Sequence, residues 1–306
     1  MKILIFGGRG YMGRQFLRIY PDALLPSADI ADHRAVADAL ERERPDVVIN
    51  AAGRTGVPNV DWCEDHKLET LRSNVTGPLV LLEECQKRGI YLVHLSSGCI
   101  YEGWKKDSKK LKDSKDSEDW NTKYGWTEED EPNFTGSFYS RTKAWSEKAL
   151  REFPVLILRL RMPFDGTPHP RNLITKLAKF DRVLDVENSI TCLTDFLAAT
   201  RILIDRHSTG IYNVVNDGAI SPYRIAELYR EMVDPSFTFE RLILGSLAQA
   251  IRGKRSNCIL STAKLKGEGI AMRPVEAAVR SALLELKNSS SVRAEVTDMS
   301  NICVQC

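Results

Sequence analysis

Tyr139 and Lys143 have the spacing that lets two side chains of a helix share a proton-transfer task. Residues four apart lie on one face of a helix, so the phenol and the ammonium are neighbours. A free phenol has a pKa of about 10, and a neighbouring ammonium favours the phenolate, which makes the tyrosine a usable acid near neutral pH. Because this spacing is common in unrelated helices, its meaning depends on what surrounds the pair.

A short apolar run at residues 91–95 predicts a buried strand that ends in two serines. Ligands of a doubly wound sheet bind at the carboxyl ends of its strands, where Ser97 can donate a hydrogen bond to a substrate carbonyl. Cys99 lies two residues further on, near the same edge. The alternative for Cys99 is a small buried apolar residue, which is what most free cysteines are.

Three glycines, Gly7, Gly10 and Gly13, follow the first apolar run of the chain at residues 3–6. In a strand–loop–helix unit, the first allows a tight turn, the second lets the backbone approach a pyrophosphate, and the third allows close helix–strand packing. The helix expected from Tyr11 onward offers amide donors to that anion. A glycine pattern alone can be an ordinary turn, but its place after an N-terminal strand favours a dinucleotide site.

The choice of cofactor depends on three charged residues. An acidic residue about 20 positions beyond the glycines binds the ribose of NAD, and Asp29 or Asp32 can be interpreted in that way, although neither clearly ends a strand. Arg9, inside the loop, can instead pair with the 2′-phosphate of NADPH through its planar guanidinium, or it can be an exposed side chain without a ligand. The sequence favours NADPH and leaves NADH open.

Length and composition indicate an ordinary globular protein. The 306 residues carry a net charge of +2, with 43% hydrophobic and 27% charged residues, so nucleic acid is not an expected partner. Seven cysteines without paired spacing predict neither a zinc site nor a disulfide framework, and we expect no metal. No apolar run approaches the roughly 20 residues of a membrane span. We therefore expect a cytoplasmic protein without an integral membrane segment.

Short apolar runs alternate with segments of helical spacing, at residues 3–6, 47–50, 91–95, 155–160 and 211–215. Because these runs are nearly continuous, the strands should be buried on both faces of a parallel sheet. The expected fold class is α/β, a doubly wound Rossmann sheet with a smaller C-terminal lobe. A further strand around residues 23–25 is the weakest element, since Pro21 and Pro26 flank it.

We expect a nucleotide-binding domain at residues 1–165 and a smaller substrate lobe at residues 166–288, part of which returns to the sheet. Residues 104–120 are rich in Lys, Asp and Ser and predict a solvated surface insertion. A helix is expected at residues 275–286, and a polar, flexible tail at residues 289–306. The last four residues, beginning at Cys303, loosely fit a prenylation motif.

Taken together, the glycine loop, the serine after a strand and the Tyr-x-x-x-Lys helix resemble the extended short-chain dehydrogenase/reductases. Further stretches are similar to the plant-type UDP-4-keto-6-deoxyglucose 3,5-epimerase/4-reductases, to which the dTDP-4-dehydrorhamnose reductases are related: residues 51–64, 132–140, 158–163, 170–176 and 255–257. The resemblance covers roughly residues 1–285. The chain departs from the pattern at residues 104–120, in the tail, and at Arg9 and Asp29.

The resemblance implies an NADPH-dependent enzyme that performs 3,5-epimerisation and 4-keto reduction of UDP-4-keto-6-deoxy-D-glucose, giving UDP-β-L-rhamnose. It assigns proton exchange at C3 and C5 to Cys99 and Lys176, and reduction at C4 to Tyr139 with Lys143. Hydrogen bonds from Ser97 and Tyr139 would stabilise the enolate oxygen. The role of Lys176 depends on the resemblance, because a solvated lysine is the commoner state of such a residue.

The resemblance also implies two sets of binding residues. The cofactor set is Gly7, Arg9, Gly10, Tyr11, Met12, Gly13, Asp29, Ile30, Ala51, Ala52, Gly53, Tyr139, Lys143, Met162 and Pro163. The substrate set is Asn59, Asp61, Ser97, Asn172 and Arg255. Arg255 can bind a phosphate with two parallel hydrogen bonds. Capping or surface roles are the alternatives, and Asp61 in particular can cap a helix that begins near Trp62.

Two other functions stay open. One is a dTDP-4-dehydrorhamnose reductase without epimerase activity, in which Cys99 and Lys176 would have no catalytic task. The other is a non-catalytic regulatory subunit that binds a dinucleotide, against which the full set of Ser97, Tyr139 and Lys143 argues. The resemblance makes a homodimer reasonable. The sequence leaves open UDP versus dTDP and whether a separate 4,6-dehydratase supplies the substrate.

Overall fold

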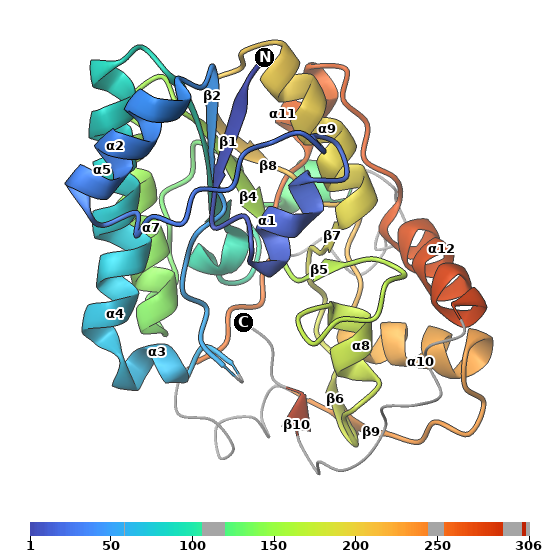
Figure 1. Cartoon of the computed structure of the whole chain (residues 1–306). Helices are drawn as coiled ribbons and strands as arrows, with labels where there is room; N and C mark the ends of the chain where they lie inside the picture. Colours follow the sequence, from blue (N-terminus) through green and yellow to red (C-terminus); the bar gives the residue numbers. More distant parts are fainter. Residues whose placement is uncertain (58, 106–119, 244–253, 290–301, 304–306) are drawn as a thin grey trace. The chain divides into compact units, whose positions relative to one another are not determined.

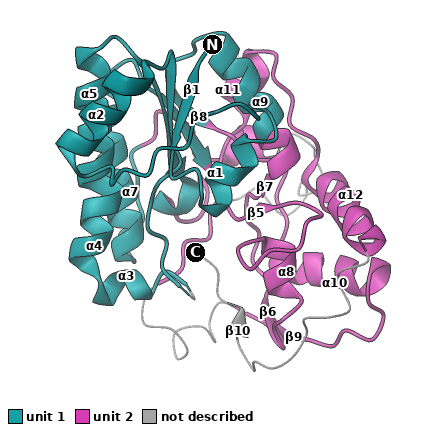
Figure 2. Ribbon diagram, in the orientation of Figure 1, with its two compact units in different colours: residues 1–100, 131–159, 197–212 teal, residues 101–130, 160–196, 213–306 magenta. Residues whose placement is uncertain are grey.

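The computed structural model describes residues 1–57, 59–105, 120–243, 254–289 and 302–303 (Figure 1). The chain divides into two compact units (Figure 2): unit 1 has residues 1–100, 131–159 and 197–212, and unit 2 has residues 101–130, 160–196 and 213–306. Each unit is therefore assembled from three segments of the chain. The expected division at residues 165 and 288 stays a prediction about independently folding domains.

A five-stranded sheet in the order β1-β2-β3-β4-β8 forms the centre of unit 1. Its strands are β1 (Ile3–Phe6), β2 (Val47–Asn50), β3 (Tyr91–Ser97), β4 (Leu156–Leu160) and β8 (Gly210–Asn213). Both β1 and β3 run parallel to β2, with Phe6 opposite Asn50 and Asn50 opposite His94. Every residue of β1, β2 and β4 is buried, which confirms the expected burial of both sheet faces.

Helices cover both faces of this sheet. They are α1 (Tyr11–Phe16), α2 (His33–Glu43), α3 (Trp62–Asp65), α4 (Lys67–Leu71), α5 (Gly77–Lys87), α7 (Phe138–Leu150) and α9 (Leu193–Asp205), with the π-helix η1 (Arg72–Thr76) and the 3₁₀ turn η2 (Gly98–Ile100). The helices α2, α5 and α7 pack side by side on one face, and α1 and α9 lie on the other (Figure 1). This is the doubly wound α/β arrangement that the sequence predicts.

Apolar side chains from the strands and helices of unit 1 form a continuous core. Leu4, Val48 and Ile157 of the sheet pack with Leu40 of α2 and Leu81 of α5, and each is at most 1% exposed. Complete burial of one such side chain is worth about 1.5–3 kcal/mol. The core therefore holds the carboxyl ends of β1, β2 and β3 in constant positions.

The strand expected at residues 23–25 is only a one-residue bridge. The Leu24 amide donates to the Ile3 carbonyl at 2.9 Å, and the Leu24 carbonyl accepts from the Ile5 amide at 2.8 Å. Pro21 and Pro26 lack the N–H group that a ladder needs, which limits the pairing on either side of Leu24.

Unit 2 contains two small sheets. One has the order β10-β6-β9, and the other pairs β5 with β7. The elements of unit 2 are β5 (Pro163–Phe164), β6 (Arg182–Leu184), β7 (Thr191–Cys192), β9 (Glu240–Leu242), β10 (Ile302–Cys303), α6 (Trp120–Tyr124), α8 (Leu173–Leu177), α10 (Pro222–Met232), α11 (Ala263–Gly267) and α12 (Val275–Asn288). Phe164, Leu228 and Leu283 belong to one buried cluster, which joins β5, α10 and α12.

Parts of two sequence expectations fall outside the described residues. These are residues 106–119 of the expected insertion, and residues 290–301 and 304–306 of the expected tail. Cys303 of the prenylation motif lies in β10, beside Val183 of β6. Within the part of the chain that the structure describes, no helix has both the length and the apolar character needed to cross a bilayer.

Candidate active site

Helix α7 carries Tyr139 and Lys143 on its buried face. The helix begins after Ser137, whose Oγ accepts a hydrogen bond from the Ser140 amide at 3.2 Å and so caps the first turn. Tyr139 is 7% exposed and Lys143 is 5% exposed. The spacing of four that suggested a shared task therefore puts both side chains on one inward-facing stripe.

Lys143 reaches the sheet and ends in a buried environment. Its Nζ donates to the Leu95 carbonyl of β3 at 2.8 Å. Burial lowers the pKa of Lys143 from 10.5 to about 8, while the nearby Glu147 carboxylate and Cys99 thiol act in the opposite direction. Lys143 is therefore mostly charged at neutral pH. Because its surroundings have a low dielectric constant, this charge interacts strongly with neighbouring groups.

Ser97 and Cys99 lie at the carboxyl end of β3, beside α7. The Ser97 Oγ accepts a hydrogen bond from the Cys99 amide at 3.2 Å, and this bond closes the turn into η2. Both side chains are buried, at 5% and 3% exposure, and α7 contacts both β3 and η2. The structure thus gathers Ser97, Cys99 and Lys143 from separate stretches of the chain, with Tyr139 one helical turn from Lys143.

A buried ion pair that was not predicted from the sequence supports this region. Arg159 of β4 and Glu147 of α7 are joined at 2.6 Å between Nη2 and Oε1, and Ser96 Oγ donates to Glu147 Oε2 at 2.6 Å. Arg159 is 1% exposed and Glu147 is 2% exposed. A signal was present, because an arginine inside an apolar strand needs a partner to be buried.

The glycine loop fits the close approach of backbone that a dinucleotide requires. Gly7 has a φ of +74°, and a Cβ at Gly7 would lie 2.5 Å from the Ala52 nitrogen. A Cβ at Gly13 would lie 2.2 Å from the Gly7 carbonyl oxygen. Side chains at these positions are therefore excluded, and the loop packs directly on residues 51–52 at the end of β2. Tyr11 and Met12, in the first turn of α1, are half-buried.

A second close approach joins the loop after β2 to Lys143. A Cβ on Gly53 would lie 3.8 Å from Lys143 Nζ and 3.3 Å from Asn74 Oδ1. Asn74 bonds the Arg54 amide at 2.7 Å and Thr142 Oγ1 at 3.2 Å, so it ties this loop to α7. Asn74 lies in η1, and π-helical turns are frequent at functional sites. Asn74 was not among the predicted site residues, because nothing in its local sequence pattern marks it.

The charged residues considered for cofactor choice are already engaged. Asp29 accepts from the Ala31 amide at 3.0 Å and pairs with Arg72 at 3.1 Å, and these contacts hold the pKa of Asp29 below its usual value. Asp32 caps α2 by accepting from the amide of Ala35. Both carboxylates therefore already make hydrogen bonds within the protein.

Arg9 and Ile30 are two further residues of unit 1 that were expected to bind the cofactor. Arg9 is exposed, and its Nη1 lies 3.5 Å from Ser27 Oγ, so a guanidinium and a hydroxyl stand together at the surface. Ile30 is buried at 5% exposure and packs so closely on Gly77 of α5 that a Cβ there would meet it at 2.4 Å.

The substrate residues expected in unit 1 form a turn. Asn59 Oδ1 accepts from the Asp61 amide at 2.8 Å, just before α3. Asp61 occupies the N-cap position of α3, but its side chain makes no capping hydrogen bond. The capping alternative for Asp61 is therefore wrong, because the backbone there is already helical, whereas a capping residue normally has an extended backbone.

The remaining predicted residues lie in unit 2. Asn172 is 1% exposed and caps α8, where its Oδ1 accepts from the Ile174 amide and its Nδ2 donates to Asp165. Lys176 is half-buried in the last turn of α8, and Arg255 is 5% exposed. Met162 adopts the left-handed conformation with a φ of 43°, directly before Pro163 and β5. A side chain rarely adopts that conformation, which marks a locally strained backbone.

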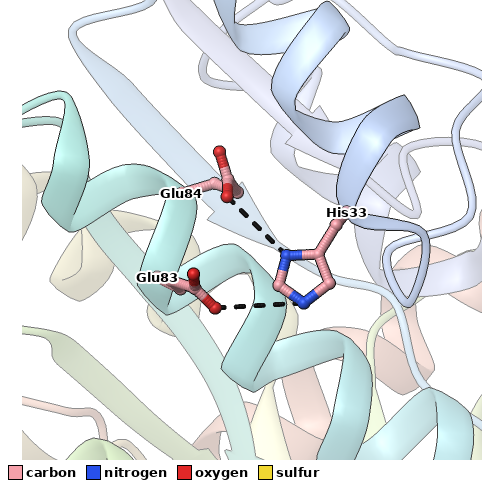
Figure 3. A group of neighbouring side chains, drawn as sticks. All are labelled: His33, Glu83 and Glu84. Atoms are coloured by element: carbon pink, nitrogen blue, oxygen red, sulfur yellow. Dashed lines mark ion pairs between the residues drawn. The ribbon is translucent and has the colours of Figure 1, made fainter.

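One group of side chains in the described residues has the composition of a metal site (Figure 3). His33 approaches Glu83 with Nε2 at 3.9 Å and Glu84 with Nδ1 at 3.7 Å. The two contacts use different ring nitrogens, whereas one ion binds only one of them. Lys87 pairs with both glutamates at 2.6 and 2.9 Å, and Arg88 pairs with Glu84. The group is a surface ion-pair network between α2 and α5.

A parallel sheet with a glycine loop after β1 and a Tyr-x-x-x-Lys helix beside β3 defines a Rossmann-type protein of the short-chain dehydrogenase/reductase class. Residues 1–288 match the RmlD substrate binding domain, and the chain belongs to that family.

Three known proteins are similar to this chain. A bifunctional dTDP-4-dehydrorhamnose 3,5-epimerase/dTDP-4-dehydrorhamnose reductase of Arabidopsis thaliana is 38% identical over 299 residues, which is 96% of each chain. The crystal structure of a UDP-rhamnose synthase from Acanthamoeba polyphaga mimivirus has a TM-score of 0.83 and 30% identity, covering 93% of this chain and 99% of that one. A dTDP-4-dehydrorhamnose reductase of Bacillus anthracis, solved with NADP, has a TM-score of 0.73 and 19% identity, covering 94% and 97%, and shows the fold alone.

The buried charge of Lys143 predicts an unusual stability effect. Lys143→Met removes an ammonium whose folded-state pKa is depressed to about 8, and we expect the free energy of unfolding to rise by about 1–3 kcal/mol at pH 7. The gain should be full below pH 8. It should shrink between pH 8 and 10.5, because the folded protein then holds Lys143 neutral, and the free-energy cost of removing a proton that the unfolded chain still binds falls to zero near pH 10.5. Urea denaturation at several pH values measures this.

The matched control is Lys148→Met, which makes the same chemical change at an exposed position of α7. We expect this variant to keep the wild-type stability within about 0.5 kcal/mol at every pH. Equal effects of the two substitutions, or a loss of stability in Lys143→Met at pH 7, would contradict the assignment of a costly buried charge.

Proposed function

We propose that this chain is an NADPH-dependent nucleotide-sugar epimerase/reductase. Its substrate would be UDP-4-keto-6-deoxy-D-glucose, its reactions 3,5-epimerisation and 4-keto reduction, and its product UDP-β-L-rhamnose. The observation that carries the proposal is the buried Lys143. It lies one turn from Tyr139 and bonds Leu95 of β3, the strand that ends in Ser97 and leads into the turn with Cys99. Relatives named as a 3,5-epimerase/reductase and a UDP-rhamnose synthase support the choice of reaction and nucleotide.

Reduction needs a proton at the oxygen of C4 when hydride arrives at the carbon. NADPH bound at the glycine loop would supply that hydride. Tyr139 would donate the proton, and the charge of Lys143 would stabilise the phenolate that remains. Ser97 would hold the carbonyl oxygen by a hydrogen bond, so that the ketone is polarised before the hydride transfer.

Epimerisation needs an acid and a base on opposite faces of the sugar ring. Cys99 would exchange the proton on one face and Lys176 on the other, while Ser97 and Tyr139 stabilise the enolate at C4. The position of Cys99 two residues after Ser97, buried and within the electrostatic range of Lys143, supports its part. Lys176 is half-buried on a short helix, and its part depends on the family resemblance.

The binding residues follow the same division. Gly7, Gly10 and Gly13 would receive the pyrophosphate of NADPH, and Arg9 with Ser27 would hold its 2′-phosphate. Asn59, Asp61 and Asn172 would line the sugar pocket, and Arg255 would bind the diphosphate. We further propose a cytoplasmic homodimer that receives its 4-keto sugar from a separate 4,6-dehydratase.

The first prediction of this proposed function concerns the overall reaction. With UDP-4-keto-6-deoxyglucose, the chain should oxidise NADPH and form UDP-rhamnose, identified by NMR. Tyr139→Phe should lower kcat by about 10²–10⁴-fold because the general acid is gone, whereas Tyr223→Phe, a partly buried tyrosine of unit 2, should leave it unchanged. Absence of NADPH oxidation with both UDP- and dTDP-4-keto sugars would favour a non-catalytic dinucleotide-binding protein.

The second prediction separates an epimerase/reductase from a simple reductase. In D₂O, the wild type should incorporate deuterium at C3 and C5, and Cys99→Ala should lower that rate at least about 10²-fold because an acid/base group is lost. Cys85→Ala, another buried free cysteine, is the control and should keep the exchange. If exchange survives in Cys99→Ala, the thiol is not the acid/base. If the wild type itself shows none, the chain is a reductase alone.

The third prediction concerns the cofactor. Arg9→Ala should raise KM for NADPH about tenfold, the value of one charge-assisted contact, and leave KM for NADH unchanged. Arg34→Ala, an exposed arginine of α2, serves as the control for a general change in charge. A parallel rise in both KM values would mean that Arg9 acts on the loop and does not contact the 2′-phosphate.

A further inference from the structure

Glu147 is a buried acid that the proposed mechanism does not use. It is 2% exposed, and both of its oxygens are occupied. Oε1 receives Arg159 Nη2 at 2.6 Å and Nε at 3.2 Å, and Oε2 receives Arg159 Nε at 3.1 Å and Ser96 Oγ at 2.6 Å. The carboxylate therefore joins α7, which carries it, to both β3 and β4.

Stability does not explain such an arrangement. Removing two charges from water costs several kcal/mol for each ion, and apolar residues of similar volume are often as stabilising as a buried pair. Apolar contacts do not fix the orientation of the groups that they join. Hydrogen bonds to a charged group do, because they are short and have a preferred angle. The ion pair is better explained by the geometry that it imposes on neighbouring residues.

The contacts of Glu147 fall beside the candidate catalytic groups in both elements. Ser96 directly precedes Ser97 in β3, and Glu147 follows Lys143 by one helical turn in α7. Lys143 itself bonds the carbonyl of Leu95. Two adjacent residues of the strand are thus bonded to two residues one turn apart in the helix, and two such points prevent both sliding and rotation of the helix on the strand.

We propose that Glu147 is a positioning residue for the reduction. Held by Arg159, it keeps the strand end that bears Ser97 in register with the helix face that bears Tyr139 and Lys143. This inference rests on the proposed function of that face and deepens it. Without Glu147, the hydrogen bond from Lys143 Nζ to the Leu95 carbonyl would be left to hold the helix on the strand. Lys143 must also stabilise the phenolate of Tyr139, so this single bond cannot fix the position of the helix.

Glu147 also belongs to the charges around Lys143. Glu147 and Cys99 act on the pKa of Lys143, and Lys143 acts on the pKa of His94. Tyr139 lies one turn away on α7, and Arg159 of β4 pairs with Glu147. Burial lowers the pKa of Lys143, and Glu147 and Cys99 raise it. His94 remains neutral, because burial holds its pKa well below the ordinary value. Loss of the Glu147 charge should therefore make Lys143 release its proton at lower pH.

The test compares Ser96→Ala with Ser146→Ala. Both serines are buried, but Ser146 bonds only the Lys143 carbonyl within α7, so its loss leaves the link between strand and helix intact. We expect Ser96→Ala to lower kcat about 10–100-fold with KM for NADPH within about twofold of wild type, because small misplacements of reacting groups are costly. Ser146→Ala should stay within about threefold of wild type in kcat.

A second variant tests the effect of the Glu147 charge on Lys143. In Glu147→Gln, the fall of kcat/KM on the alkaline side should move to lower pH, since activity requires the Lys143 proton and the carboxylate no longer helps to retain it. Because the substitution leaves Arg159 buried without its counter-ion, the variant can fail to fold. The paired change Glu147→Gln with Arg159→Gln then replaces it, as two amides can bond each other in the same space.

A readout without substrate keeps the inference separate from the proposed function. Amide hydrogen exchange at residues 94–101 should be about tenfold faster in Ser96→Ala than in Ser146→Ala, which follows the loss of the strand anchor. If wild type reduces no 4-keto sugar, the proposed function fails and the exchange rates decide the positioning role. If Ser96→Ala matches Ser146→Ala in exchange, or in kcat where the wild type is active, the inference is overturned.

Discussion

The central constraint in this structure is an ammonium group kept out of water. Lys143 ends at a backbone carbonyl of β3 under nearly complete burial, which lowers its pKa to about 8, while Glu147 and Cys99 act to raise that pKa. In a medium of low dielectric constant, a charge acts on its neighbours far more strongly than it would in water. Two features of the candidate site approach this group directly: the Leu95 carbonyl accepts its hydrogen bond, and a Cβ on Gly53 would lie 3.8 Å from Lys143 Nζ.

The surroundings of Lys143 are built from parts that are costly in themselves. Arg159 and Glu147 give up hydration to form their pair, and glycines replace side chains where β1, β2 and α7 approach one another. Such costs are common at functional sites, because precise placement of a few groups is worth more there than stability. The large apolar core under the sheet compensates for them.

Much of the scaffold could be predicted because it is a matter of local pattern. The strands β1 and β2 were expected with their observed bounds, and α7 and α12 were expected at the observed places, since apolar runs and helical spacing are visible in the sequence. The strand expected near Leu24 is only a one-residue bridge, because two prolines flank it and limit its pairing. Asn74 and the Ser96–Glu147–Arg159 group were missed, because each acquires meaning only through partners far away in the chain.

The sequence by itself determined the order of strands and helices, the glycine loop and the helical face shared by Tyr139 and Lys143, because each depends on residues within a few positions of one another. The tertiary structure alone decided that Lys143 bonds Leu95, that Glu147 joins Ser96 to Arg159, and that Asp29 pairs with Arg72. The physical reason is that burial and long-range pairing depend on how the elements pack. The residues next to a side chain in the sequence determine neither its charge state nor its partner.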